Sequence, residues 1–299
     1  AAEAGAAHVY AAEASAVVPH LETLVAAHGL GHKITVLRGR IEDQQLDGVD
    51  VILSEWMGYF LLREAMVQSV LIARDRWLRP GGVMYPSHAR LLLAPASVAD
   101  FARRQRAEMT RALVGYDALA AELAGNYGLK LEALREGYSK EQFTYFFREA
   151  WQGHLPAREI LGDAQTLLDV DMHTVTMAEL FGWTVNGVQL PLRPGQVAHG
   201  LCGWFDVRFS GRGDQPDEHC VELDTAPTAR PTHWAQTTLL LDAPMDGTEE
   251  LTVSLRQNEK FHHDINVTIA CAKWAASYAI TADFRGYFDG TNGHDGGGG

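Results

Sequence analysis

One stretch near the start of the chain, residues 50–64, constrains the fold more than any other, and it reads DVILSEWMGYFLLRE. Its first apolar run, residues 51–53, is typical of a buried parallel strand. The run ends abruptly at Glu55, so a carboxylate stands at the carboxyl end of a strand, and a second carboxylate, Glu64, follows nine residues later. Because a glycine lies between them, we expect the chain to turn and return, so that both carboxylates face one pocket.

The pattern also indicates what such a pocket would bind. Two carboxylates among aromatic residues repel one another, and one pKa rises unless a cation lies between them. A guanidinium suits this position because its planar fork of N–H donors can be held on two edges. The sequence therefore predicts a site that holds an arginine side chain.

Length, charge and cysteine content limit the class of protein. A chain of 299 residues is long enough for two domains. It has no apolar run of about 18 residues and no signal-peptide pattern, so we expect no membrane span and a cytoplasmic and/or nuclear location. The cysteines Cys202, Cys220 and Cys271 are widely spaced, which favours reduced thiols. The net charge of −13 argues against nucleic-acid binding and favours basic partners such as an arginine-rich polypeptide.

Residues 1–86 have the pattern of the later part of a doubly wound α/β domain. Strands are expected at 8–12 and 33–37, and Glu13 and Glu42 follow them. An acid after a strand is where nucleoside-binding folds place a ribose acceptor, and Glu42 could accept a hydrogen bond from the exocyclic amine of a base. Alternatively, both are solvated loop acids. The glycine-rich turn of such folds lies about 20 residues earlier, before the first residue given, so we expect a chain that begins inside the fold.

The pattern changes after Pro86. A helical excursion is expected over about residues 100–165, broken at 126–128 and at Gly137. Its aromatic residues are expected to dock on a second subunit or, alternatively, on their own domain; they are Phe143, Tyr145, Phe146, Phe147 and Trp151. Short strands then follow at 197–209, 233–241, 251–257, 265–271 and 278–284, which favours a β-sandwich or barrel. Residues 287–299 are glycine-rich, and we expect them to be disordered.

The residues 54–64 (SEWMGYFLLRE), together with Thr232-His233-Trp234, resemble the protein arginine methyltransferase family, in particular its type I branch. The long helical excursion is similar to that of a plant or algal long-arm branch. The resemblance implies an α/β Rossmann-like methyltransferase domain, N-terminally truncated, over residues 1–86. An antiparallel β-barrel substrate domain over 87–286 would follow, with an inserted helical dimerisation arm at about 100–165.

The same resemblance implies a role for each site residue. Glu55 and Glu64 would grip the substrate guanidinium, and the released proton would go to Glu64 directly or through His233. The cofactor would be S-adenosyl-L-methionine, with Glu13 at its ribose and Glu42 at its adenine amine. The remaining positions line the methyl donor or the substrate channel: Met57, Tyr59 and Trp234. Taken alone, His233-Trp234 is an ordinary strand pattern.

Activity, products and partners follow from the resemblance as expectations. The products would be mono- and asymmetric dimethylarginine in Arg/Gly-rich or histone-like proteins, made by a homodimer. The glycine-rich cofactor motif and an N-terminal helix are absent, so we expect the chain as given to be inactive and its full-length parent to be active. Two alternatives stay open: an inert scaffold relative and a small-molecule methyltransferase. We expect no metal site, because His262-His263-Asp264 lacks further ligands at suitable spacing.

Overall fold

The computed structural model describes residues 1–211, 220–247 and 249–281. These form two compact units, the first made of Ala1–Ser54 and Val67–Tyr85, and the second of Glu55–Met66 with the chain from Pro86 onward. Residues 55–66, here called the double-glutamate loop, therefore belong with the second unit, whereas the sequence grouped them with residues 1–86. The expected glycine-rich tail lies outside the described residues.

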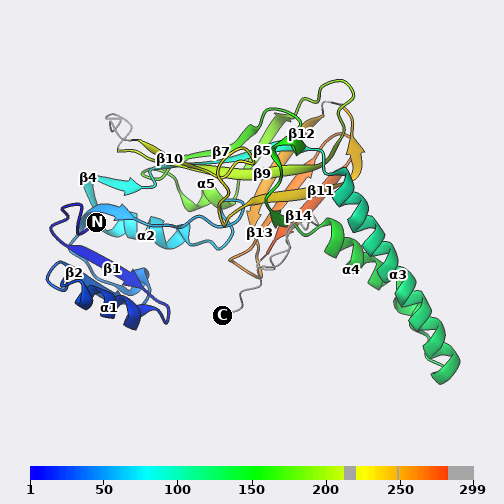
Figure 1. Cartoon of the computed structure of the whole chain (residues 1–299), viewed down its shortest axis with the longest axis horizontal. Helices are drawn as coiled ribbons and strands as arrows, with labels where there is room; N and C mark the ends of the chain where they lie inside the picture. The colour runs from blue at the N-terminus through cyan, green and yellow to red at the C-terminus, as the bar shows by residue number, and fades with distance from the viewer. Residues whose placement is uncertain (212–219, 248, 282–299) are drawn as a thin grey trace. The chain divides into compact units, whose positions relative to one another are not determined.

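The first unit contains two strand–helix–strand segments with parallel strands (Figure 1). In one, β1 (Val9–Glu13) pairs with β2 (Ile34–Arg38) across helix α1 (Val18–Ala27). In the other, β3 (Val49–Leu53) pairs with β4 (Leu78–Tyr85) across helix α2 (Val67–Trp77). Parallel strands need such a crossover, so the α/β class predicted from the sequence is confirmed.

Strand β4 is an element that the sequence did not predict. Its Arg79-Pro80-Gly81-Gly82 segment was interpreted only as a helix terminator, and α2 does end just before it, at Trp77. The register explains why a strand tolerates these residues: Val49 pairs with Leu78, but Val51 pairs with Val83. The intervening residues of β4 therefore bulge opposite Asp50, where ladder hydrogen bonds are not required.

The second unit is built on two antiparallel sheets. The larger has the order β6-β11-β9-β5-β7, with β10 beside β9. Its strands are β5 (His88–Ala96), β6 (Trp151–Gly153), β7 (Gln165–Asp171), β9 (Ala198–Phe209), β10 (Val221–Asp224) and β11 (Gln236–Met245). The smaller has the order β14-β13-β12-β8, from β8 (Thr184–Gln189), β12 (Glu250–Gln257), β13 (Ile265–Ala270) and β14 (Ala275–Ile280).

The smaller sheet buries one face through a period-two pattern. Along β12 and β13 every second residue is fully buried: Leu251, Val253, Leu255, Ile265, Val267 and Ile269. Alternation of this kind is the mark of a sheet that packs on one face. A short helix, α5 (Met177–Phe181), precedes β8 and begins with a capping box between Thr176 and Glu179.

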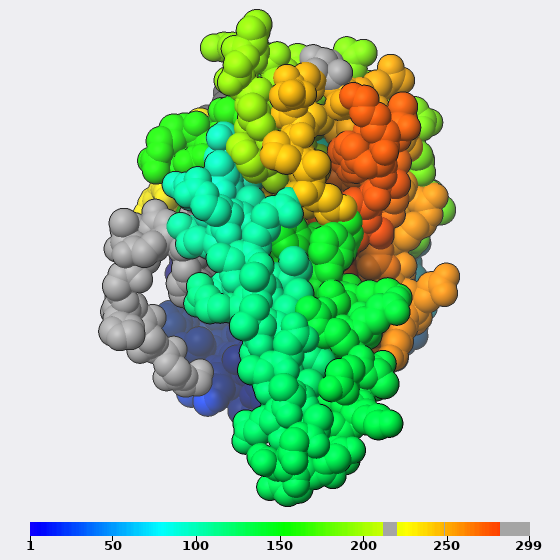
Figure 2. Space-filling view, turned by 90° about the vertical axis from the view of Figure 1, so that its right-hand side faces the viewer, coloured from blue at the N-terminus to red at the C-terminus, as the bar shows by residue number. Residues whose placement is uncertain are grey.

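A pair of helices is inserted between β5 and β6 and projects from the sheets (Figures 1 and 2). Helix α3 (Ala99–Tyr127) ends at Gly128, whose φ of +69° gives the left-handed cap that glycine favours. A short turn, η2 (Leu131–Leu134), leads to α4 (Arg135–Phe147). The break at 126–128 was expected, but a break at Gly137 is wrong, because Gly137 lies inside α4. The helical part also ends at Phe147 rather than near residue 165, and β6, a 3-10 turn (η3, Ala157–Glu159) and β7 follow.

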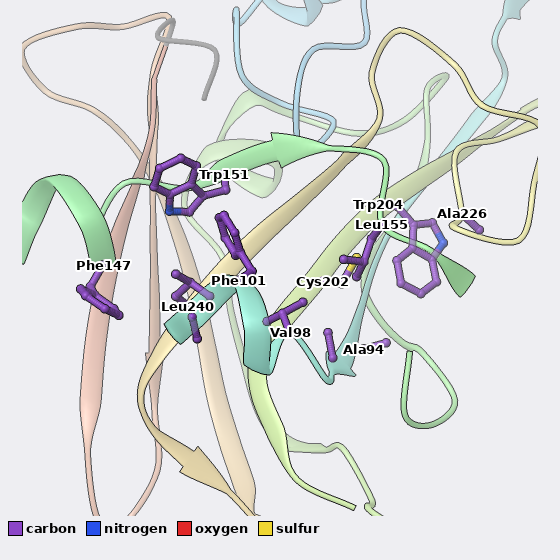
Figure 3. Packing of buried hydrophobic residues seen from close by; sticks show 12 residues of the cluster. Ala94, Val98, Phe101, Phe147, Trp151, Leu155, Cys202, Trp204, Ala226 and Leu240 are labelled. Carbon is purple, nitrogen blue, oxygen red and sulfur yellow. The ribbon is translucent and has the colours of Figure 1, made fainter. Parts of the chain in front are cut away.

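The aromatic residues at the base of this arm pack mainly on their own unit. Phe147 and Trp151 are buried in a cluster with Phe101, and the rings of Phe101 and Trp151 meet edge to face at 5.1 Å (Figure 3). Phe143 and Phe146 pack against the same cluster, whereas Tyr145 is exposed. Phe147 and Trp151 therefore pack on their own unit, against β9 and β11, which agrees with the second of the two expectations for these residues.

Candidate functional site

The double-glutamate loop has a buried apolar middle and exposed ends. Trp56, Phe60, Leu61 and Leu62 are each no more than 2% exposed, while Glu55 lies at the surface. The Phe60 ring lies directly on Gly203 of β9: a Cβ added at Gly203 would come within 2.1 Å of Phe60 Cε2. Burial of these side chains holds the loop on the sheet and leaves its carboxylates facing water.

The turn of this loop depends on a glycine. A Cβ at Gly58 would lie 1.5 Å from the carbonyl oxygen of Arg63, so a larger residue does not fit. The Gly58 amide donates to the Leu61 carbonyl at 3.0 Å, and the Arg63 amide donates to the Tyr59 carbonyl at 3.1 Å. The loop therefore folds back on itself within a few residues.

Several residues of the loop have positive φ although they are not glycine. Phe60 and Leu61 have φ of +51° and +65°, and Glu64 and Ala65 have +89° and +57°. Left-handed conformations of this kind are costly for residues with a Cβ and persist only where their surroundings enforce them. Such strain is concentrated at functional sites in many proteins, and here it lies at one of the two predicted guanidinium ligands.

The two carboxylates differ in their surroundings. The Glu64 side chain is half exposed, and its Oε1 lies 3.3 Å from Nη1 of Arg63. Arg63 is mostly buried and also lies near Asp264, with Nε 3.5 Å from Oδ1, which is an ion-pair distance without good hydrogen-bond geometry. In the described part of the chain, Glu55 makes no hydrogen bond or ion pair in the structure. The first carboxylate is therefore open to an incoming cation, and the second is shared with Arg63.

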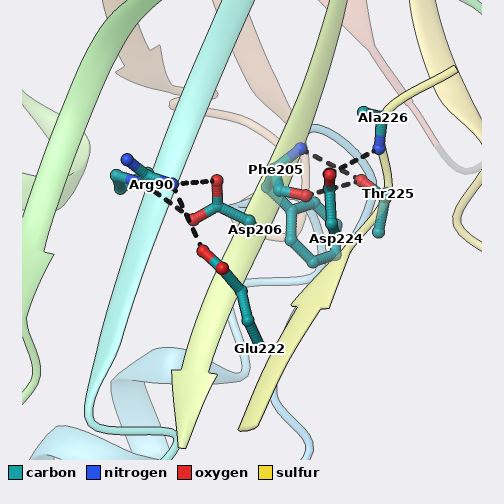
Figure 4. A network of polar contacts seen from close by, with 7 residues as sticks. All are labelled: Arg90, Phe205, Asp206, Glu222, Asp224, Thr225 and Ala226. Carbon is teal, nitrogen blue, oxygen red and sulfur yellow. Dashed lines mark hydrogen bonds and ion pairs between the residues drawn. The ribbon is translucent and has the colours of Figure 1, made fainter. Parts of the chain in front are cut away.

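A second loop, residues 225–235, carries the predicted Thr-His-Trp segment and is fixed at both ends. At its start, Thr225 Oγ1 donates to the Phe205 carbonyl at 2.8 Å and accepts from the Phe205 amide at 3.1 Å (Figure 4). At its end, Gln236 Nε2 donates to the Thr225 carbonyl at 2.7 Å. Both side chains are at least 96% buried, so these hydrogen bonds are protected from water.

The strands on which this loop stands are joined by a polar network. Arg90 of β5 donates two hydrogen bonds to Asp206 of β9, at 2.9 and 2.7 Å, and one to Glu222 of β10 at 3.3 Å (Figure 4). The bidentate geometry is the strong form of an arginine–carboxylate pair. The network ties β10, which leads into the Thr-His-Trp loop, to the two central strands of the sheet.

The structure brings three of the predicted site residues together. Trp234 Nε1 donates to the Met57 carbonyl at 2.7 Å, so the Thr-His-Trp loop is bonded to the double-glutamate loop. The Trp234 ring also packs against Phe205 edge to face at 5.5 Å, and the His233 ring lies 3.8 Å from it. His233 is exposed, while Trp234 and Tyr59 are half-buried and Met57 is buried. These neighbours are far apart in sequence, and the hydrogen bond joins the two loops.

The two acids expected to bind the cofactor lie in the first unit. Glu13 ends β1, and its Oε1 accepts a hydrogen bond from the Ser15 amide at 2.7 Å. This hydrogen bond, together with one from the Ser15 hydroxyl, lowers the pKa of Glu13 below its ordinary value. The carboxylate is therefore ionised at neutral pH.

Glu42 lies in the short 3-10 helix η1 (Ile41–Asp43) that follows β2. Its Oε1 accepts from Ser69 Oγ at 2.6 Å and from Arg40 at 3.2 Å. Burial acts to raise the pKa of Glu42, but the hydrogen bonds from Ser69 and the charge of Arg40 outweigh it, and the pKa is lowered. Glu42 is therefore not merely a solvated loop acid; it is oriented by α2, on which Ser69 lies.

Three further residues shape the site although no sequence pattern predicts such a role for them. Thr225 and Gln236 fix the Thr-His-Trp loop, and His263 bonds to the backbone of Glu64. No local pattern marks them, because each acts on a residue distant in sequence. Within the described residues there is no cluster of three or more His, Cys, Asp or Glu side chains able to hold a metal ion. In the same part of the chain no helix is long and apolar enough to cross a membrane.

Comparison with known proteins gives a consistent result. Residues 105–273 match the family model of the arginine methyltransferase oligomerization subdomain. The chain is 37% identical over 276 residues to protein arginine N-methyltransferase PRMT10 of Arabidopsis thaliana, an alignment that covers 90% of this chain and 72% of the relative. It is 38% identical to the PRMT10 of Oryza sativa subsp. japonica, covering 82% of this chain and 64% of that protein.

Solved structures agree with the sequence relatives. The crystal structure of Arabidopsis thaliana protein arginine methyltransferase 10, described as a uniquely open conformation, is similar with a TM-score of 0.89 at 34% identity and covers 94% of this chain and 84% of that one. A Trypanosoma brucei PRMT1 enzyme–prozyme complex with AdoHcy gives a TM-score of 0.75 at 26% identity, covering 94% and 84%. The fold class predicted from the sequence, including the helical insert, is thereby confirmed. The chain belongs to the protein arginine methyltransferase family.

Proposed function

We propose that the full-length protein transfers a methyl group from S-adenosyl-L-methionine to guanidinium nitrogens of arginine in protein substrates. The observation that carries this proposal is the construction of the double-glutamate loop. Its apolar middle is buried on β9, its two carboxylates lie toward solvent at either end, and its backbone is bonded to Trp234. A loop built in this way presents two acids on a rigid support.

Paired carboxylates address the main difficulty of the reaction. A guanidinium is a poor nucleophile because its lone pairs are delocalised and its pKa exceeds about 12. Glu55 and Glu64 would draw positive charge toward two edges of the guanidinium and leave the target nitrogen richer in electron density. They would also hold it at the separation of roughly 3–3.5 Å that attack on a methyl carbon requires.

The residues of the first unit fit the cofactor by their chemistry. The ionised carboxylate of Glu13 would accept from ribose hydroxyls, and that of Glu42, oriented by Ser69, would accept from an exocyclic amine. S-adenosyl-L-methionine would supply a sulfonium-bound methyl group, and the electron pair of its C–S bond would stay with sulfur as the N–C bond forms. The arginine nitrogen then loses a proton, which Glu64 accepts directly or through His233. We propose Met57 and Tyr59 as further lining residues, and type I products, mono- and asymmetric dimethylarginine.

The test compares the full-length protein with its Glu64→Gln variant. Glutamine keeps the shape of the side chain but removes the charge and the proton acceptor, so methyl transfer to an Arg/Gly-rich peptide should fall by at least about 100-fold. Binding of S-adenosyl-L-methionine should be unchanged. Glu3→Gln removes an exposed acid of the first unit and serves as the matched control. Retained turnover by Glu64→Gln, measured with a radiolabelled methyl group, would contradict the two-carboxylate mechanism.

One observation favours a second candidate, an inert relative that serves as a scaffold. The carboxylate of Glu64 is already shared with Arg63, so a substrate guanidinium would have to compete with a cation of the chain itself. Arg63 is mostly buried, but the Glu64 side chain is half exposed and the two charged atoms lie 3.3 Å apart, so a well-placed substrate guanidinium can compete for the carboxylate. Calorimetric titration with S-adenosyl-L-methionine separates the candidates, because an inert scaffold without cofactor binding would show no heat of binding.

We also propose that the arm joins two copies of the protein. Its outer part exposes apolar side chains beyond the base cluster: Val114, Leu119, Tyr127, Leu129 and Leu134. Apolar side chains left exposed on a projecting hairpin favour docking on a partner. Leu129→Glu with Leu134→Glu should convert a dimer to a monomer in sedimentation velocity, whereas an unchanged sedimentation coefficient would contradict the arm's role. The net charge of −13 favours Arg/Gly-rich or histone-like substrates.

A further inference from the structure

The connection between β12 and β13, residues 258–264, is a tightly ordered loop, here called the His263 loop. Asn258 Oδ1 accepts from the amides of Lys260 and Phe261, both at 2.9 Å. Gln257 Nε2 donates to the His262 carbonyl at 2.6 Å. The Asn258 amide donates to the Asp264 carbonyl at 2.9 Å, and this hydrogen bond closes the loop. The loop therefore has a defined shape of its own and can support another segment.

The segment that it supports is the second end of the double-glutamate loop. The Glu64 amide donates to the His263 carbonyl at 2.7 Å. The Glu64 carbonyl in turn contacts His263 Nδ1 at 2.7 Å. One residue thus engages both backbone groups of Glu64, so the peptide planes on either side of the carboxylate-bearing carbon are fixed together.

The contact with His263 lies at residues whose backbone conformation is strained. Glu64 and Ala65 have φ of +89° and +57°, conformations that a residue with a Cβ leaves unless it is held. Small changes in φ at Glu64 would swing its carboxylate, because the side chain leaves the backbone at the same atom. The neighbouring ion pair between Arg63 and Asp264, at 3.5 Å, joins the same two loops at the next position.

We propose that His263 is a positioning residue for Glu64: by holding both backbone groups of Glu64 in a left-handed conformation, it aims the carboxylate at the substrate guanidinium. This inference rests on the proposed function. The contact also determines which ring nitrogen of His263 carries a hydrogen. A carbonyl oxygen can only accept, so Nδ1 of His263 must be the donor. Neutral and protonated imidazole both meet this requirement.

The test uses three variants of the full-length protein. His263→Ala removes the ring but keeps the backbone carbonyl, and His263→Asn places an amide N–H near the position of Nδ1. His262→Ala is the matched control, because the adjacent His262 side chain makes no hydrogen bond among the residues described. Loss of one hydrogen bond of this kind corresponds to a change in kcat of about two- to tenfold.

We expect His263→Ala to lower kcat for an Arg/Gly-rich peptide by about two- to tenfold, with the Kd for S-adenosyl-L-methionine unchanged. His263→Asn should recover most of the loss, and His262→Ala should match the parent. If the contact only stabilised the fold, His263→Ala would lower the melting temperature, but His263→Asn would not restore kcat. Parent-like kcat in His263→Ala would overturn the proposal.

A second readout does not depend on activity. Amide hydrogen exchange at Glu64 and Ala65 should become faster in His263→Ala but not in His263→Asn or His262→Ala, and nitrogen-15 NMR of the parent should show His263 protonated at Nδ1. If the parent lacked methyl transfer while exchange responded as described, the proposed function would fail and the positioning contact would stand. Unchanged exchange, or a neutral ring protonated at Nε2, would refute the contact itself.

Discussion

Substitution of Gly58 by alanine should disable substrate methylation without affecting cofactor binding. The added Cβ would begin 1.5 Å from the Arg63 carbonyl oxygen, and contacts below 3.0 Å are essentially never observed, so the two chain segments must separate until the distance doubles. That movement breaks the Gly58–Leu61 and Arg63–Tyr59 backbone hydrogen bonds, which contribute about 1 kcal/mol each. It also displaces Glu64, which follows Arg63 directly. A misplacement of about 1 Å at a reacting group costs about 100-fold in rate.

The assay is steady-state methyl transfer to an Arg/Gly-rich peptide, with thermal unfolding and cofactor titration run in parallel. We expect kcat/KM to fall by about 100-fold or more, unfolding to occur at a lower temperature, and affinity for S-adenosyl-L-methionine to stay within about threefold. Gly31→Ala is the matched control, because a Cβ there meets nothing within 4 Å and φ is not in the left-handed region. A Gly58→Ala variant with the parent's kcat/KM would refute the claim that this turn sets the position of Glu64.

Three further outcomes are expected. Trp234→Phe removes the hydrogen bond to the buried Met57 carbonyl but keeps an aromatic ring, so it should cost about 1 kcal/mol in unfolding free energy and lower kcat/KM severalfold, as measured by denaturant titration and the peptide assay. Arg148→Met breaks the bidentate pair with Asp242 at the base of the arm and should cost about 1–3 kcal/mol by the same titration, with cofactor affinity unchanged. Because hydrogen bonds from Ser15 lower the pKa of Glu13 below its ordinary value of 4.5, its carboxylate should stay ionised as pH falls from about 6 to about 4.5, where an ordinary glutamate is about half protonated; the Glu13 contribution to cofactor affinity, measured by calorimetry against Glu13→Gln, should be level over that interval.

Much of the fold was predictable because its signals are local. The apolar run at 51–53 and the period-two patterns at 251–257 and 265–271 each depend on side chains that are close in sequence, and each became a strand within a residue or two of the expected limits. Gly128 predicted the end of α3 for a similar reason, since a left-handed cap is a property of one residue. Gly137 is also a glycine, but it does not adopt the left-handed conformation, and α4 continues through it.

The rest depended on contacts between distant residues. Strand β4 could not be predicted, because Pro80 and the two glycines that follow it are unfavourable in a strand. They are accommodated in a bulge opposite Asp50. The base of the arm packs inward because the larger sheet offers an apolar face to its aromatic rings, which the arm's own sequence does not reveal. The contact between His263 and Glu64 joins residues 199 positions apart, so no sequence window contains both.

The central claim is that Glu55 and Glu64 hold an arginine guanidinium, and one calorimetric comparison tests it most directly. The full-length protein, saturated with S-adenosylhomocysteine, would be titrated with an Arg/Gly-rich peptide and with the same peptide carrying citrulline in place of arginine. Citrulline keeps the shape of the side chain but has no charge. We predict at least about tenfold weaker binding of the citrulline peptide, and loss of that difference in Glu64→Gln. Equal affinities for the two peptides in the parent protein would contradict the account.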